Sequence, residues 1–433
     1  MLKTLRNAWR IEELRKKILF TLLIILLYRL GNSVPVPYVD TTLLAQYFRS
    51  MQNTVLGLYD VMSGGAFSQA TIFALSIQPY INASIIIQLL AIAIPALERL
   101  QKEEGEEGKK KLESITRYST IAIGLLQGFA YYMLIKNGFN GQTMLSADGT
   151  GIWPAIVIIL TFTSGSAIIM WMGEQITEFG IGNGISIILF ASIVSRIPNS
   201  VVTTVRNVKG GDLMWYSAVL MLLGALAIII LIVFVNDAER RIPVQYSKRV
   251  VGRKMYGGQS THLPMKVNMS GVLPIIFAQS IAALPATVCA FVTKWQDSWI
   301  MTHVFDTTTW PYGLIYFLLI IFFSYFYATI QFNPIEVSNN LKKNGGYIPG
   351  YRPGKPTSEF LQRVLNKITL FGAIYLGIVA VVPIIITQFS DVASKTGLSL
   401  GGTSIIIVVG VALETVRALE AQMLMRNYKG FLS

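Results

Sequence analysis

Few residues of this sequence could perform acid–base or metal chemistry, and they lie far apart. The chain has two histidines, His262 and His303, and one cysteine, Cys289. A zinc site needs clustered Cys or His residues and a disulfide needs a second cysteine, so we expect neither. A proton relay needs several neighbouring titratable groups, which two separated histidines do not supply. We therefore expect no metal, no cofactor and no redox chemistry.

The segment GIGNG at residues 180–184 superficially matches a phosphate-binding loop. A true loop of this kind follows a strand and continues into Lys-Ser or Lys-Thr, and this segment does neither. We interpret it as a tight turn between two helices, flanked by Glu174 and Glu178. Glu414 and Arg417, three residues apart, are expected to form a local pair on one helix. No catalytic constellation stands out, so we predict that the chain is not an enzyme.

The composition points to lipid as the main surroundings of the chain. Of 433 residues, 53% are hydrophobic and 14% are charged, whereas soluble domains carry about 25% charged residues. A helix needs about 20 mainly apolar residues to cross the hydrocarbon core of a membrane. Ten segments qualify, at residues 18–34, 72–94, 115–135, 153–172, 184–205, 214–235, 270–292, 311–331, 367–388 and 402–419.

The basic residues give this ten-span topology an orientation. Short loops rich in Lys and Arg remain in the cytoplasm. With a cytoplasmic N-terminus, 28 of the 36 Lys and Arg residues fall on the inner side and seven on the outer side. We therefore expect both termini in the cytoplasm. The formal net charge of +13 then belongs mainly to the N-terminal arm and to the cytoplasmic segments.

An even number of spans favours two inverted halves of five helices. We predict an all-α polytopic membrane protein with an N-terminal half at residues 1–205 and a C-terminal half at residues 206–433. The spans carry almost no ionisable residues in mid-membrane, which disfavours a proton-coupled pump. A secondary solute transporter and a non-transporting scaffold remain the alternatives.

Five long motifs resemble those of the bacterial SecY family, in order along the whole chain. They are GGA followed by PYINASIIIQLL within residues 64–90, GEQITEFGIGNGISII at 173–188, QSTHLPMKVNMSGVLPIIFA at 259–278, PGYRPGKPT at 349–357 and GGTSIIIVV at 401–409. The resemblance implies the pore-forming subunit of the Sec protein translocase. Unfolded secretory polypeptides would cross through it, and hydrophobic segments would leave sideways into the bilayer.

The same resemblance implies partners for the chain. These are SecE-type and SecG-type subunits, the SecA motor ATPase, the ribosome with its ribosomal RNA, substrate polypeptides with signal sequences, and membrane lipids. A narrow apolar ring can pass a polypeptide while it excludes ions, because it loses water when empty. By position in the motifs, the candidates for the ring are Ile81, Ile85, Leu189, Ile193, Ile276 and Ile407.

Three further sites follow from the resemblance. A plug is expected near residues 58–73 as a short helix in the outer funnel, with Asp60, Ser63, Gly64, Gly65 and Phe67 as its main residues. A lateral gate, where helices two and three meet seven and eight, would contain Gln88, Gln127, Gln279 and Ser280. Cytoplasmic loops near 236–269 and 332–366 would bind partners through Arg240, Arg241, Lys248, Arg249 and Arg352.

Overall fold

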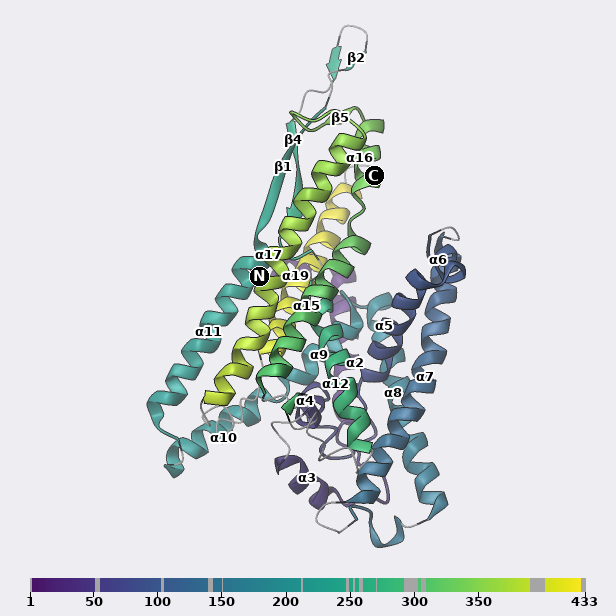
Figure 1. Cartoon of the computed structure of the whole chain (residues 1–433), viewed down its shortest axis with the longest axis vertical. Coiled ribbons are helices and arrows are strands. Elements are labelled where there is room, and N and C mark those ends of the chain that lie inside the picture. The colour runs from purple at the N-terminus through teal and green to yellow at the C-terminus, as the bar shows by residue number, and fades with distance from the viewer. Residues whose placement is uncertain are drawn as a thin grey trace.

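Long helices run roughly side by side along the long axis of the molecule, with a β-hairpin at one end (Figure 1). The computed structural model describes residues 2–50, 55–102, 105–138, 143–149, 151–211, 213–246, 249–251, 254–256, 260–269, 271–291, 303–304, 309–389 and 402–429. Short helices α3 and α4 lie at the end opposite the hairpin, at Thr41–Ser50 and Val55–Met62.

The described part of the first half of the chain contains nine further elements. They are α1 (Leu2–Arg10), α2 (Glu12–Gly31), α5 (Gln78–Ala93), α6 (Pro95–Lys102), α7 (Gly105–Asn137), the 3₁₀ turn η1 (Ala147–Gly149), α8 (Ile152–Phe179), α9 (Gly184–Val194) and α10 (Ile197–Gly210). The second half contains α11 (Trp215–Asp237), α12 (Leu273–Phe291), α15 (Trp310–Gln331), α16 (Pro334–Lys343), α17 (Lys355–Phe389) and α19 (Gly402–Lys429).

Each of the ten predicted spans falls on a helix, which confirms the polytopic helical fold. Among the described residues, six helices are long and apolar enough to cross a membrane, and two shorter apolar helices lie at Gln78–Ala93 and Leu273–Pro285. The predicted boundary between the halves, at residue 205, falls inside α10.

The second predicted span, 72–94, is helical over a shorter length than the sequence suggested. Helix α5 begins only at Gln78, and residues 72–77 form buried irregular backbone. Pro79 lies in the first turn of α5. Backbone N–H groups in the first turn have no hydrogen-bond partner within the helix, so a proline there loses no helical hydrogen bond. The apolar character of residues 72–77 therefore reflects burial beside the plug segment rather than helix.

The fifth predicted span, 184–205, is two helices rather than one. Helix α9 ends at Val194 and α10 begins at Ile197, with Pro198 in its first turn. Proline cannot donate the hydrogen bond that a continuous helix would need there. The break leaves Arg196 at the corner between the two helices.

The two loops predicted on the basic side form one small antiparallel sheet. Strand β1 (Glu239–Tyr246) pairs with β4 (Ser260–Lys266) in a register that places Ile242 opposite Leu263. Strand β5 (Gly346–Tyr347) from the other loop pairs with the end of β1, which gives the strand order β4-β1-β5. Strands β2 (Arg249–Val251) and β3 (Lys254–Tyr256) form a separate two-stranded sheet.

A separate apolar core joins these two loops to the ends of α15 and α17. Ile242 and Val244 alternate with exposed residues along β1, the period-two pattern of a sheet with one covered face. They pack with Met265, Ile348 and Leu361. No pattern in the two loops predicts this shared core.

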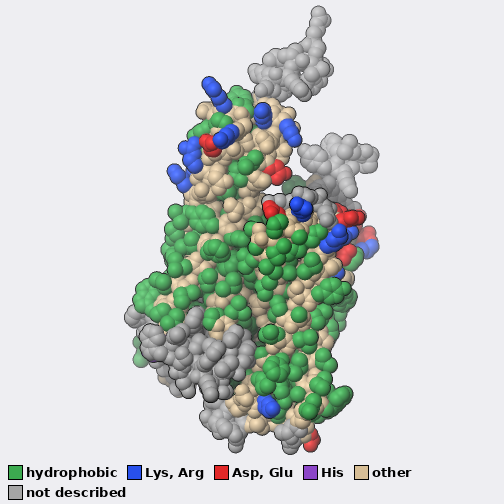
Figure 2. Space-filling model, turned by 45° about the vertical axis from the view of Figure 1, so that its right-hand side comes forward, with side chains coloured by type: hydrophobic (Ala, Val, Ile, Leu, Met, Phe, Trp, Pro, Cys, Tyr) green, Lys and Arg blue, Asp and Glu red, His purple; other side chains and the backbone are tan. Residues whose placement is uncertain are grey.

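The outer surface has an apolar belt with basic residues at the hairpin end. Figure 2 shows hydrophobic side chains over the middle of the molecule and most of the visible Lys and Arg side chains near the hairpin. Helix α11 is the extreme case, with Leu220 and Phe234 72% and 74% exposed. An apolar face of this size suits contact with lipid rather than water.

Candidate functional site

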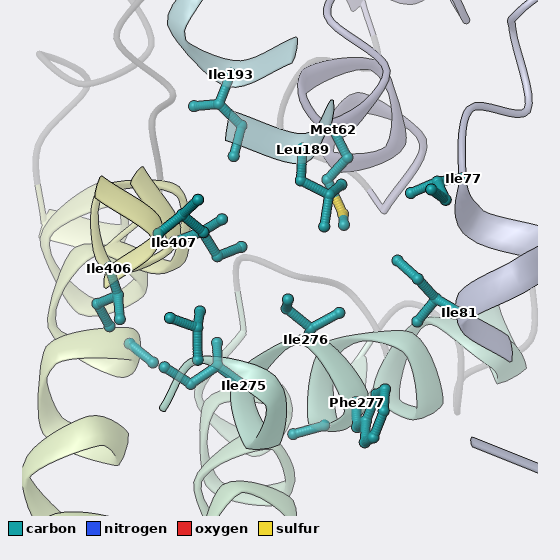
Figure 3. Close-up of a cluster of buried hydrophobic side chains, with 14 of the residues drawn as sticks. Met62, Ile77, Ile81, Leu189, Ile193, Ile275, Ile276, Phe277, Ile406 and Ile407 are labelled. Atoms are coloured by element: carbon teal, nitrogen blue, oxygen red, sulfur yellow. The ribbon is translucent and has the colours of Figure 1, made fainter. Parts of the chain in front are cut away.

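All six residues predicted for the ring lie in one buried apolar cluster, called the central cluster below. Its ring members are Ile81, Ile85, Leu189, Ile193, Ile276 and Ile407, and each is at most 3% exposed. They come from four helices, α5, α9, α12 and α19. In Figure 3 the five labelled ones, all but Ile85, surround one space. The six carry no charged or polar side-chain atom.

The sequence did not single out Met62, which also belongs to the central cluster. Met62 is the last residue of α4 and is 3% exposed, and Figure 3 shows it beside Leu189 at the same space. The available signal was its place next to the SGG turn, where Gly64 and Gly65 have positive φ angles of 70° and 91°. Such angles favour glycine and let the chain reverse directly after Met62.

The predicted plug segment, residues 58–73, is folded differently from the expected helix. Helix occupies Val55–Met62, and residues 63–77 form turns that pack inside the molecule. Ser63 closes the first turn, because its hydroxyl donates to Asp60 O (3.0 Å) and accepts from Phe67 N (3.0 Å). The glycines after it prevent a longer helix at little steric cost.

Side chains from two neighbouring helices bond to the backbone of the plug segment. The Tyr28 hydroxyl contacts Ser63 O (3.3 Å) and Ser192 Oγ (2.7 Å). The Tyr131 hydroxyl donates to Phe67 O, and its ring stacks on Phe67 with 4.3 Å between centroids. These contacts place the segment against α2, α7 and α9, all of the first half of the chain.

An ion pair fixes the helical part of the plug segment. Arg196 Nη1 lies 2.6 Å from Asp60 Oδ2, and the two side chains are 27% and 10% exposed. The other oxygen, Asp60 Oδ1, accepts from Ser68 N at 2.8 Å. Asp60 therefore links α4 to the turn that follows it and to the α9–α10 corner. The break at Pro198 is what brings Arg196 to this position.

We predict that Asp60→Asn weakens the attachment of the plug segment. The amide can still accept from Ser68 N but no longer neutralises Arg196, a change that costs about 1 to 3 kcal/mol for a partly buried charged contact. The resting ion conductance of the purified complex in planar bilayers should therefore rise.

Asp40→Asn is the matched control for this prediction. Asp40 also lies at the α3–α4 end, but its carboxylate accepts from Thr42 and from Leu43 N and does not contact the plug segment. These bonds, led by that of the Thr42 side chain, lower the pKa of Asp40. Equal conductance of Asp60→Asn and wild-type channels would contradict the proposed role of the ion pair.

The four residues predicted for the lateral gate do not form one network. Gln88 of α5 is hydrogen-bonded to Tyr327 of α15, so this pair does join helices of the two halves. Gln279 is 3% exposed and bonds to Met62, while Ser280 is equally buried and its hydroxyl has no partner among the described residues. Gln127 of α7 instead lines a cavity beside the plug segment.

The predicted docking residues are only partly described. Arg240 and Arg241 are exposed on β1, and Arg241 Nε pairs with Glu239 Oε1 at 2.7 Å. Arg352 is exposed on the loop between β5 and α17. Lys248 lies outside the described residues, and Arg249 is described only as backbone of β2.

Arg417 connects α19 to the base of the hairpin rather than pairing with Glu414 as predicted. Its Nη2 lies 2.5 Å from Asp237 Oδ1 and donates to Asn236 O at 2.9 Å. Asn268, at the other root of the hairpin, donates to Asn236 Oδ1 at 2.9 Å. The prediction was wrong because it considered only neighbours on one helix, whereas the end of α11 lies beside α19.

The segment 180–184 is a turn between α8 and α9, as predicted. The Asn183 side chain caps α9 by accepting from Ile185 N (3.1 Å) and Ser186 N (3.3 Å). A Cβ atom on Gly184 would lie 1.9 Å from Gly173 O. Only glycine therefore allows the start of α9 to lie this close to the backbone of α8. Glu174 beside it pairs with Arg117 at 2.8 Å.

Within the described ranges, no group of three or more His, Cys, Asp or Glu residues could bind a metal ion.

Comparisons with known proteins agree on one family. A family model described as SecY matches residues 71–416. The protein translocase subunit SecY of Streptomyces coelicolor is 44% identical over 447 residues, covering 100% of both chains. A solved structure of a SecY protein, in which the plug domain stabilises the closed state of the translocation channel, has a TM-score of 0.68 at 16% sequence identity. This match covers 94% of this chain and 92% of that one. Sec61 in a canine ribosome-channel complex has a TM-score of 0.62 at 14% identity, with the same coverage.

Proposed function

The chain belongs to the SecY family, and we propose that the six ring residues of its central cluster form the constriction through which polypeptides cross the membrane. As a SecY family member, it is the central subunit of a protein-conducting channel. It passes unfolded secretory polypeptides across the membrane and releases hydrophobic segments laterally into the bilayer. The solute-transporter alternative has no support from these relatives.

One observation carries the assignment of the constriction. Six aliphatic side chains from four helices meet in the centre of the molecule, without a charged or polar atom among them. Such a ring is dry when empty and therefore blocks ions. It also binds no particular sequence, because it offers a passing chain only dispersion contacts.

The segment 58–73, with Asp60, Ser63, Gly64, Gly65 and Phe67, is proposed to be the plug. Its contacts with Tyr28, Tyr131 and Arg196 all come from the first half of the chain. In the solved SecY structure of similar fold, the plug domain stabilises the closed state of the translocation channel. Here the plug would rest mainly on residues 1–205, and its contact with Gln279 of the second half would break when residues 206–433 move relative to it.

The lateral gate is proposed to open between α5 and α7 of the first half and α12 and α15 of the second. The Gln88–Tyr327 hydrogen bond crosses this boundary directly. Gln279 and Ser280 lie on α12, and their amide and hydroxyl groups would make this boundary more polar than a lipid-facing surface. Gln127 lies on α7 but lines the cavity beside the plug segment.

The basic end of the molecule is proposed to face the cytoplasm of a bacterial cell, with both chain termini on that side of the plasma membrane. Arg240, Arg241, Lys248, Arg249 and Arg352 would dock the SecA motor or ribosomal RNA there. The canine Sec61 structure of similar fold is a ribosome-channel complex, and phosphate contacts by Arg and Lys are the usual basis of such binding. SecE-type and SecG-type subunits would contact the lipid-exposed helices.

Crosslinking to a stalled secretory polypeptide tests the proposed function. A photo-crosslinking amino acid at Ile85 or at Ile276 should form a covalent product with the polypeptide, because both side chains are in the central cluster. The same group at Phe234, 74% exposed on α11, should not. With a demonstrably stalled polypeptide, crosslinks at Phe234 and none at the two isoleucines would refute the constriction.

A further inference from the structure

Met62 is a plug residue that lies among the ring residues. It is the last residue of α4 and is 3% exposed. Met62 and Phe73 are the two residues of 58–73 that are buried members of the central cluster. Figure 3 shows its side chain at the space that Leu189, Ile81 and Ile276 border. Met62 therefore brings a flexible side chain of the plug to the space between these ring residues.

Two side-chain amides contact the sulfur of Met62 from different halves of the chain. Gln78 Nε2 lies 3.1 Å from Met62 Sδ and Gln279 Nε2 lies 3.4 Å from it. Gln78 belongs to α5 and Gln279 to α12, and both residues are at most 4% exposed. A thioether is a weak acceptor, so these contacts position the side chain without binding it strongly.

We propose that Met62 is the residue that closes the constriction, and that Gln78 and Gln279 are positioning residues that hold its thioether over the ring. This rests on the proposed function, since it assumes that the central cluster is the constriction. An unbranched thioether fits irregular gaps between branched side chains. The Met62 side chain can therefore pack against the six aliphatic ring residues in the closed channel and separate from them when it opens.

The glutamines are a poor choice for packing alone, which argues that their amides act on Met62. The Oε1 atoms of Gln78 and Gln279 are buried and have no hydrogen-bond partner among the described residues. An unpaired buried carbonyl destabilises the state that contains it, and leucine in either place would avoid this. In the closed channel these two carbonyl oxygens thus lack hydrogen bonds, which water or a polypeptide backbone could donate once Met62 has moved away.

Resting ion conductance of the purified complex in planar bilayers tests the role of Met62. Met62→Ala should raise the conductance several-fold, and Met62→Leu, which restores most of the volume, should raise it less. Val61→Ala is the matched control, since Val61 precedes Met62 on α4 and is also buried, at 4% exposed, but is not a member of the central cluster. Equal conductance of Met62→Ala and Val61→Ala would overturn the proposal.

A double-mutant comparison tests the amides separately from folding. Gln279→Leu should raise the conductance in the wild-type background and add nothing in the Met62→Leu background, because the sulfur that it positions is already absent. An equal increase in both backgrounds would show that Gln279 acts only on packing and would overturn its role. If Ile276→Gly conducts and Met62→Ala does not, this inference fails while the constriction stands; if neither conducts, the constriction itself fails.

Discussion

Replacing Ile276 and Ile407 together with glycine should make the resting channel conduct ions. Both side chains are buried in the central cluster, at 3% and 1% exposed, and they come from different helices, α12 and α19. Their loss widens the apolar ring on two sides, and a wider ring retains water and ions. We expect the largest increase in conductance of any variant considered, measured on the purified complex in planar bilayers.

Ile275→Gly with Ile406→Gly is the matched control for this pair. These residues precede Ile276 and Ile407 on the same two helices and are 0% and 1% exposed. They are also members of the central cluster but not of the six-residue ring, and they point about 100° away from the ring residues around each helix. Each glycine destabilises its helix by about 1 kcal/mol in either pair, so a general loosening of the fold would affect both equally. Conductance that rises equally in both pairs would reject the ring assignment.

The helical fold could be predicted because its causes are local in the sequence. Ten apolar segments of membrane-spanning length and the distribution of basic residues depend only on composition and spacing. The two errors in span limits also have local causes, Pro79 at the start of α5 and Pro198 at the start of α10. Both prolines are visible in the sequence, and reading them as helix starts would have corrected the limits.

Contacts between distant segments could not be predicted in the same way. The six ring residues were found by their place in family motifs, because isoleucine in a membrane helix has no signal of its own. Arg196 and Asp60 are 136 residues apart, and Gln279 and Met62 are 217 apart. Only the folded chain brings such pairs together, since neither the charge of Asp60 nor the thioether of Met62 indicates its partner.

Arg352→Glu should abolish protein export while the channel still inserts and folds. Arg352 is exposed on a loop whose backbone is held at two points, by Thr357 Oγ1 donating to Arg352 O (2.8 Å) and by Ser338 Oγ donating to Gly354 O (2.7 Å). Tyr351 adds a stacking contact with Phe360 at 4.3 Å. The guanidinium is therefore presented to a partner at little cost in loop entropy.

The expected size of this effect follows from charge reversal at a docking surface. A like charge placed opposite an acidic partner costs several kcal/mol, and about 3 kcal/mol weakens binding roughly a hundredfold. Lys355→Glu is the control, because it makes the same charge change three residues away, in the first turn of α17, where a helix favours an acidic side chain. Export of a secretory precursor into membrane vesicles should stop with Arg352→Glu and continue with Lys355→Glu. Loss of export in both variants would assign the effect to net charge, and normal export in both would place the docking surface elsewhere on the basic end.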